Sequence, residues 1–316
     1  MVFPKNINKK KKHSTAKEIG GKKLFLMTLP FLIATFIFSY VPLFGWSFAF
    51  FDYKAGHKLL DTNFVGLKYF LVPFSNPILR DDIVRVLRNT LVMSFLGMAT
   101  SILPMIFAIF LGEISSKRYR KAVQTLTTIP HFISWVLVYS VVWSLFSIND
   151  GLVNNVLLKF GLIETPIAFL GTSKNVWITQ WAYGQWKNLG WNAILYISAL
   201  TSIDTELYEA AEIDGAGRFS KMLYITVPGL LPTFFVLLML SIGNLLNNGM
   251  EQYYIFQTAM NKEYIEVLDL YVYNQGIQGN NISYATAVGM TKSIISLILL
   301  FTANWFSKLV RGDSIF

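Results

Sequence analysis

The chain has 316 residues, of which 53% are hydrophobic and only 14% are charged, and its formal net charge is +9. A typical soluble domain carries about 25% charged residues, so this composition excludes a soluble globular enzyme. The aromatic content of 16% excludes a disordered chain. The absence of cysteine excludes a disulfide scaffold, a thiol nucleophile and a cysteine-ligated metal site. The class that remains is an integral membrane protein.

Six stretches with few charged residues predict six transmembrane helices, because about 20 mostly apolar residues cross the hydrocarbon layer as a helix. Lys187 and Lys292 are the charged residues in their interiors. We expect an all-α membrane protein with a basic tail over 1–23, a six-span domain over 24–312 and a short end over 313–316. In chain order the spans are expected at about 24–48, 89–112, 122–147, 175–201, 229–250 and 284–308.

The distribution of basic residues predicts that both termini lie inside the cell. In that orientation the tail, two loops and the C-terminal end hold 16 of the Lys and Arg residues, against nine in the outside segments. The tail has no aromatic residues interleaved with its lysines, so we expect it to lie near anionic lipid and expect no nucleic acid as a partner. Three outside segments, 52–88, 150–174 and 251–283, separate the spans.

A polar segment between the fourth and fifth spans holds five of the 18 acidic residues, between Asp204 and Asp214. Asp204 is a good N-cap for a helix over 205–213, and Gly215 permits the left-handed backbone that ends it. A second helix is expected from Ala216 to about 227, where prolines break it and begin the fifth span. The residues by themselves allow either a docking elbow or a plain interfacial loop.

Nine residues of this segment resemble the EAA loop of binding-protein-dependent ABC importer permeases. They are Glu209, Ala210, Ala211, Asp214, Gly215, Ala216, Ile225, Pro228 and Pro232. One departure is Met222, which stands where an aromatic residue is usual; a flexible Met also suits packing in a cleft. The resemblance implies a type I ABC importer permease architecture. It also implies that the elbow, with Glu209 to Ala211, Asp214 to Ala216, Met222 and Pro228, is a coupling helix seated in a cytoplasmic ATPase.

Other motifs resemble the branch of this family that imports oligo- and polysaccharides in Gram-positive bacteria. They are Tyr40-Val41-Pro42 with Gly45, Phe50 to Tyr53, Val65-Gly66-Leu67 and Asn89-Thr90, so the resemblance covers about 22–312. It implies a multi-pass protein of the bacterial cell membrane that works with a second homologous permease, a cytoplasmic ATPase dimer and an extracellular sugar-binding protein or lipoprotein. The alternatives are a same-class permease for an amino acid or phosphate, a homodimer, and an integral membrane enzyme or receptor.

Polar side chains inside the spans are candidates for a transport pathway, because such groups must face protein or water at membrane depth. Trp181, Gln185, Asn188 and Asn192 form one helical stripe, and Ser241, Asn244 and Asn248 form another. Amides and hydroxyls suit sugar hydroxyls, but they also join helices to one another, and the residues do not decide between these roles. In maltose-type permeases the matching positions of Asn188, Trp191, Ser241 and Asn248 hold sugar. The pathway candidates are therefore Gln185, Asn188, Trp191, Asn192, Ser241, Asn244 and Asn248.

No bond-breaking constellation is visible in the sequence. His13, His57 and His131 are scattered, and no phosphate-binding Gly-rich loop with Lys is present. We therefore expect no catalytic residue, no metal site and no cofactor in this chain, with ATP and Mg bound by the partner ATPase. Whether Lys187 and Lys292 are structural or line the pathway is left open by the sequence.

Overall fold

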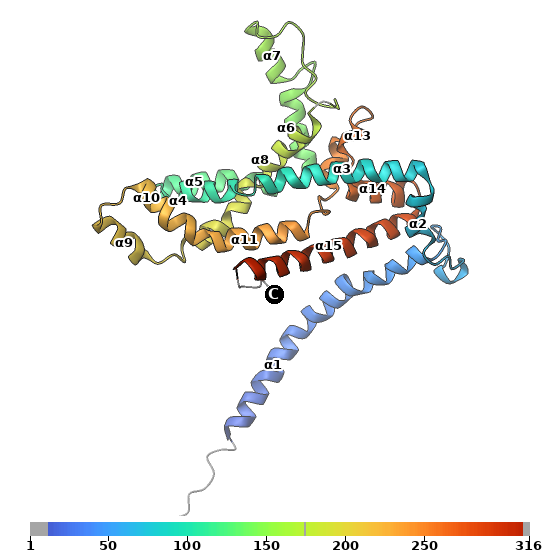
Figure 1. The fold of residues 1–316 in the computed structure, drawn as a ribbon, viewed down its shortest axis with the longest axis horizontal. Coiled ribbons are helices and arrows are strands. Elements are labelled where there is room, and N and C mark those ends of the chain that lie inside the picture. Colours follow the sequence, from blue (N-terminus) through green and yellow to red (C-terminus); the bar gives the residue numbers. More distant parts are fainter. Residues whose placement is uncertain (1–11, 174, 312–316) are drawn as a thin grey trace, which may run out of the picture.

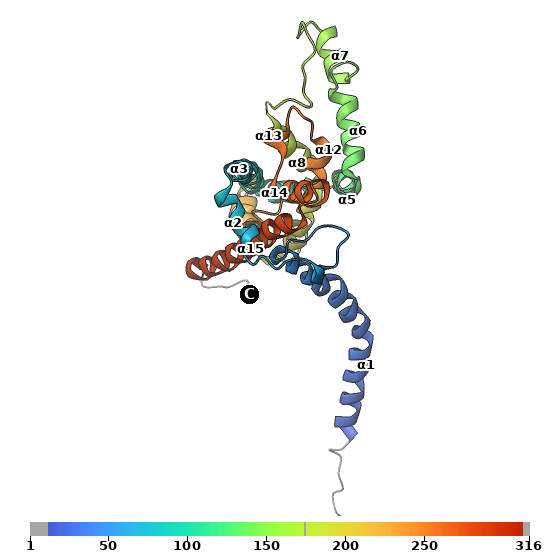
Figure 2. The ribbon, with the colours of Figure 1, turned by 90° about the vertical axis from the view of Figure 1, so that its right-hand side faces the viewer.

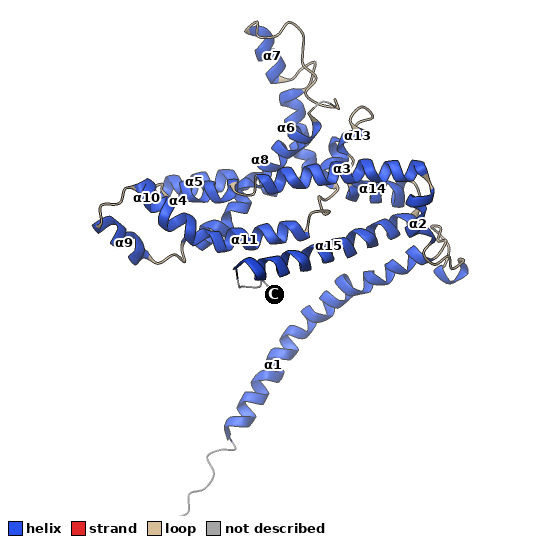
Figure 3. Ribbon diagram, in the orientation of Figure 1, coloured by secondary structure: helices blue, strands red, loops and turns tan. Residues whose placement is uncertain are grey.

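The computed structural model describes residues 12–173 and 175–311, and the regular structure in these ranges is helical, as the sequence predicted (Figure 3). Side chains are described over 21–308 without 174. Residues 1–11 of the predicted basic tail and the predicted end over 313–316 lie outside the described residues. One isolated antiparallel bridge, between Phe51 and Phe64, accompanies the helices.

The first apolar segment comprises α1 (Lys12–Thr35), η1 (Phe36–Tyr40) and η2 (Val41–Phe50). α1 stands apart from the rest of the chain, whereas η2 packs against the C-terminal helix α15 (Ile282–Arg311). In both views α1 diverges from the helical bundle, and none of its most apolar stretch is buried (Figures 1 and 2). An apolar helix with no cover from its own chain must be covered by lipid or by another protein.

The second apolar segment is longer than predicted, because it begins at Pro77 and not near residue 89. It follows η3 (Leu59–Asp61) and α2 (Lys68–Ser75), and it comprises α3 (Pro77–Ala99) and α4 (Leu103–Gly112). Asn76 caps α3 by accepting hydrogen bonds from the backbone of residues 78 and 79, and Pro77 suits the first helical position. Arg85 is paired with Asp82 and Glu266, at 2.9 and 2.8 Å, so charged residues are accommodated in the first turns.

A side-chain hydrogen bond helps to fix the loop before α2 against this helix. The Tyr69 hydroxyl donates to the Asp52 carboxylate at 2.5 Å. Burial, together with the Asp52 carboxylate, raises the pKa of Tyr69 to about 12, so this donor keeps its proton at neutral pH.

The third apolar segment was predicted as a single span over 122–147, and the structure breaks it. It comprises α5 (Lys117–Thr128), η4 (Ile129–Phe132) and α6 (Trp135–Phe146), with a bend of 105° between Phe132 and Trp135. Pro130 lies inside the break and Ser134 caps α6. α6 continues into α7 (Leu152–Lys159), which projects from the bundle (Figures 1 and 2).

The fourth and fifth segments flank the predicted elbow. They are α8 (Val176–Leu200), α9 (Thr205–Ile213), α10 (Arg218–Lys221), η5 (Met222–Thr226) and α11 (Val227–Gly243). The predicted helix break at Pro228 was wrong, because α10, η5 and α11 follow one another as a single helix of 26 residues, Arg218–Gly243. The wider π turn of η5 ends at Thr226, two residues before Pro228, where the missing proline N–H would interrupt an α-helix. This helix ends at Gly243, seven residues before the predicted end of the span at 250.

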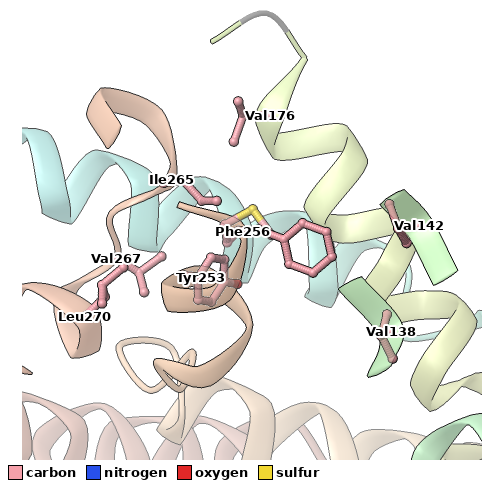
Figure 4. Close-up of a cluster of buried hydrophobic side chains, with 9 residues drawn as sticks. Val138, Val142, Val176, Tyr253, Phe256, Ile265, Val267 and Leu270 are labelled. Atoms are coloured by element: carbon pink, nitrogen blue, oxygen red, sulfur yellow. The ribbon is translucent and has the colours of Figure 1, made fainter. Parts of the chain in front are cut away.

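The remaining chain forms short helices and one long one. They are α12 (Glu251–Phe256), α13 (Lys262–Ile265), α14 (Leu268–Tyr273), η6 (Asn274–Gln278) and α15 (Ile282–Arg311). A buried apolar cluster joins this segment to α6 and α8; Val138, Tyr253, Phe256 and Val267 are among its members (Figure 4). The cluster fixes 251–273 against α6 and α8.

Four helices of the described chain are long and apolar enough to cross a membrane, or five if the bent α5–α6 pair counts as one crossing. α8 has sufficient length but is not among them, because its amide, Lys and Gly residues lower its hydropathy. The described chain is therefore a multi-helix membrane protein, with fewer clearly apolar crossings than the six predicted.

The close approach of α8 to α5 depends on a glycine. A Cβ at Gly190 would lie 2.3 Å from the Thr127 carbonyl oxygen, whereas a Cβ at Gly184 of the same helix would meet only the Gln252 side chain, at 3.9 Å. We predict that Gly190→Ala destabilises the purified protein by about 1–3 kcal/mol, because backbone must move. Gly184→Ala is the control and should be neutral or slightly stabilising. Thermal unfolding in detergent measures both, and equal melting temperatures for the two variants would contradict the close crossing.

Candidate functional site

A polar cavity of about 440 Å³ lies between α3, α8 and α11. One wall runs from Met93 to Pro104, a second from Gln185 to Tyr196, and the third from Leu237 to Asn248. Five of the seven predicted pathway residues line it: Gln185, Asn192, Ser241, Asn244 and Asn248. The structure thus brings together most of the two stripes that the sequence indicated.

The first two walls are joined through Thr100, at the junction of α3 and α4. The Thr100 hydroxyl donates to the Leu96 carbonyl at 2.7 Å and accepts from Trp181 Nε1 at 3.0 Å and Gln185 Nε2 at 3.2 Å. A hydroxyl can act as donor and acceptor at once, which suits it to this junction. α8 is therefore held to the α3–α4 junction by side chains beside the cavity.

The third wall ends in a turn and not in a continued helix. Because α11 stops at Gly243, Asn244 to Asn248 lie in the turn after it. Ser94 of α3 donates to the Leu245 carbonyl at 2.6 Å and accepts from Asn248 Nδ2 at 3.1 Å, and Asn247 Nδ2 donates to Asn244 Oδ1 at 3.2 Å. We call residues 244–249 the asparagine turn.

The chemistry of the described lining is neutral and rich in hydrogen-bonding groups. It contains amides and hydroxyls, with Met, Leu and Tyr side chains between them and no charged side chain. The Ser241 hydroxyl donates to the Leu237 carbonyl at 2.9 Å, so its oxygen is left to accept from a ligand. Such a lining can bind a neutral molecule with many hydroxyl groups.

The two remaining pathway candidates, Asn188 and Trp191, do not line the cavity. The Trp191 ring stacks on His131, with centroids 4.4 Å apart and planes 2° from parallel, and Asn188 Oδ1 lies 2.9 Å from His131 Nδ1. They therefore hold the break between α5 and α6 to α8, which is the helix-joining role that the sequence had left open.

Lys187 contacts the same break. Its ammonium donates to the carbonyls of Pro130 at 3.1 Å, His131 at 2.7 Å and Ile133, and the residue is only 6% exposed. Lys292, in α15, pairs with Asp269 of α14. Neither lysine lines the polar cavity, so both have a structural place in this chain.

Several cavity residues were missed by reasoning from sequence. Ser94, Thr100 and Ser101 lie in a stretch that looks uniformly apolar, and Tyr196 lies in α8. The spacing of seven residues between Ser94 and Ser101 would place them on one face of a continuous helix and could have revealed them, although the structure puts Ser101 in the turn after α3.

The elbow forms as the sequence predicted over its first helix. α9 spans Thr205–Ile213, Asp204 accepts from the Glu206 N–H at 3.0 Å, and Gly215 has a φ of +81°. The Ala216 N–H donates to the Ala211 carbonyl at 2.8 Å, which closes the C-terminal cap.

The elbow is anchored to the bundle at few points and presents apolar groups outward. Tyr208 and Thr226 share a hydrogen bond of 2.9 Å, and Lys221 pairs with Glu212 at 3.2 Å. Ile213 is 88% exposed and Phe219 is 79% exposed, and neither was among the predicted coupling residues.

The predicted coupling residues divide into two groups by their surroundings. Glu209, Ala210, Asp214, Gly215 and Pro228 are exposed, whereas Ala211 and Ala216 are half-buried at the turn. Met222 is also half-buried, and it packs against an apolar cluster of α4, α8 and α11.

Comparison with known proteins identifies the family. Residues 100–312 match the family described as the binding-protein-dependent transport system inner membrane component. Protein LplB of Bacillus subtilis (strain 168) is 38% identical over 298 residues, which cover 93% of this chain and 91% of that protein. The polygalacturonan/rhamnogalacturonan transport system permease protein YteP of the same organism is 38% identical over 319 residues, which cover 100% and 96%.

Solved structures agree with this result. The chain is similar, with a TM-score of 0.81 and 32% identity, to a bacterial ABC transporter involved in the import of the acidic polysaccharide alginate, over 94% of this chain and 99% of that one. A structure of the bacterial alginate ABC transporter in complex with an alginate pentasaccharide-bound periplasmic protein gives a TM-score of 0.82 and 32% identity, over 95% and 99%.

The chain belongs to the family of binding-protein-dependent transport system inner membrane components. It is a membrane-embedded permease subunit of the ABC importer class and not an enzyme, as the EAA-loop resemblance indicated.

The absence of native cysteine allows the cavity to be probed directly. We predict that the thiol of Asn192→Cys reacts quickly with a charged, water-soluble methanethiosulfonate, because Asn192 is exposed and lines the cavity. Its neighbour Ala193 is fully buried, so Ala193→Cys should stay unmodified in the folded protein. Mass spectrometry after timed labelling distinguishes the two, and equal labelling of both would contradict a water-filled cavity bounded by this face of α8.

Proposed function

We propose that this chain is one of two transmembrane subunits of an ATP-driven importer, and that an oligosaccharide or polysaccharide passes through the polar cavity. The observation that carries the proposal is the cavity itself, where neutral amides and hydroxyls from three separated segments converge inside apolar helices. Groups of this kind exchange hydrogen bonds with sugar hydroxyls without needing a charge on the solute.

A sugar fits this cavity better than the alternative solutes do. Phosphate and most amino acids present few hydroxyl groups to match the amides and hydroxyls of the described lining, whereas every sugar unit presents several. Relatives named for carbohydrates support the same class: the arabinooligosaccharides permease AraP of Bacillus subtilis is 27% identical over 95% of this chain, beside the polygalacturonan/rhamnogalacturonan permease.

The proposed topology has six crossings of the bacterial cell membrane, with both termini on its cytoplasmic side. The four apolar helices, the bent α5–α6 pair and α8 supply them. The basic residues on the inside segments, which include the start of α5, support this orientation.

The proposed partners follow from surfaces that this chain leaves uncovered. A second, homologous permease would cover the exposed apolar face of α1 and complete the cavity. An ATPase dimer, which would bind ATP and Mg, would receive α9 and its exposed Ile213. An extracellular sugar-binding lipoprotein would deliver the solute to 52–88 and 251–283, as the alginate transporter's complex with its periplasmic protein suggests.

α8 offers a direct mechanical connection between the elbow and the cavity. It ends at Leu200, four residues before the N-cap of α9, and its other turns carry Gln185 and Asn192. Closure of the ATPase dimer would displace α9, and the rigid α8 would transmit this displacement to the cavity wall.

ATPase docking can be tested at Ile213. We predict that Ile213→Asp weakens binding of the ATPase more than tenfold, because burial of one Ile side chain is worth about 1.5–3 kcal/mol. Ile213→Leu is the matched control and should assemble normally; both variants should fold, since the side chain contacts little in this chain. Copurification and ATPase activity in nanodiscs provide the measurement. Wild-type assembly of the Asp variant would refute this docking surface.

The solute class can be tested in cells. A strain that lacks this chain should lose growth on one oligosaccharide or polysaccharide as sole carbon source, and a plasmid copy should restore it. Asn244→Leu should not restore growth, because it removes an exposed cavity amide whose hydrogen bonds, to the Leu240 carbonyl and from Asn247, are local and add little to folding. Loss of growth confined to an amino acid or to low phosphate would overturn the sugar assignment.

A further inference from the structure

One carboxylate connects three parts of the chain beside the cavity. Asp269 of α14 accepts from the Lys292 ammonium of α15 with Oδ1 and from the Gly249 backbone N–H, at 2.8 Å, with Oδ2. The Asp269 and Lys292 side chains are only 19% and 15% exposed. The bridge therefore runs from Lys292 in α15, through Asp269 in α14, to Gly249 in the turn that follows α11.

The bridged residue closes the asparagine turn. Gly249 has a φ of +74°, a conformation that side chains rarely adopt, and it directly follows Asn247 and Asn248 of the cavity wall. The other end of the turn is held by the bond from Ser94 to the Leu245 carbonyl, and Leu246 is buried in an apolar cluster with Leu268 and Tyr271. Asp269 is thus the polar anchor at the C-terminal end of the turn.

We propose that Asp269, oriented by Lys292, is a positioning residue that fixes the amides of the asparagine turn in the cavity. Its importance for transport rests on the proposed function; its effect on the turn does not. An anionic acceptor binds a backbone N–H about twice as strongly as a neutral one, and a side chain with one oxygen on Lys292 cannot rotate away from Gly249. Lys292 accordingly acts on the cavity only through Asp269.

Single substitutions cannot test this role, because each leaves an uncompensated charge in a place of low exposure and disturbs folding generally. Two neutral double variants avoid the problem. In Asp269→Asn with Lys292→Met, an amide oxygen remains to accept from Gly249. In Asp269→Ala with Lys292→Met, both charges and the acceptor are absent. The two variants have the same net charge and differ at one side chain.

The measurement uses the full chain in its purified complex in nanodiscs, with a nitroxide label on Asn247→Cys. We expect the label to be ordered in the Asn/Met variant and clearly more mobile in the Ala/Met variant, by electron paramagnetic resonance. A label on Asn192→Cys, across the same cavity, should be unchanged in both, and so should the melting temperature. This local pattern separates positioning from a general structural role.

Uptake in proteoliposomes of the carbohydrate identified by the growth test supplies the second readout. The Ala/Met variant should need about fivefold more sugar for half-maximal rate than the Asn/Met variant, the equivalent of one neutral hydrogen bond of about 1 kcal/mol. Equal mobility of the label at position 247 in both variants would overturn the positioning role. A mobile label with unchanged uptake would instead leave the positioning role intact and contradict passage of sugar along this turn.

Discussion

The placement of the functional elements depends on the Lys187 ammonium, which donates hydrogen bonds to the backbone carbonyls at the break between α5 and α6. A helix that bends by 105° within an apolar segment frees backbone carbonyls, and hydrocarbon offers them no partner. Lys187 donates to three of them, and the His131–Trp191 stack and the Gly190 crossing bring α8 against the same break. Because one face of α8 is fixed in this way, the opposite face is directed toward α3 and α11, and a polar cavity forms there.

Part of this arrangement could be predicted from sequence because its causes are local. Asp204 and Gly215 define the limits of α9 through capping chemistry, which depends on a few neighbouring residues. The polar stripe of α8 and the polar residues at the end of α11 and in the turn after it followed from the cost of polar groups at membrane depth. That rule says only that such a group must face protein or water, so Asn192 and Asn188 looked equivalent. In the structure Asn192 faces the cavity, whereas Asn188 contacts His131.

Other features depend on contacts between distant residues and were not predictable. The break in the third segment has one local signal, Pro130, but the cation that compensates it lies 54 residues or more away. The turn that follows α11 is held by Ser94 and Asp269, which come from elsewhere in the chain. Pro228 predicted a helix break that does not occur, because a preceding π turn lets the helix continue.

Together these features describe a permease in which α8, the elbow and α11 follow one another in the chain, while α3 supplies the third wall of the polar cavity. The central claim is that sugar passes through the cavity between α3, α8 and α11. Its most direct test is a cryo-electron microscopy structure of the assembled importer, trapped with its oligosaccharide by an ATPase variant that binds but does not hydrolyse ATP. The account predicts sugar density within hydrogen-bonding distance of Asn192, Ser241 or the asparagine turn. Sugar density along another route, with this cavity holding only water, would contradict it.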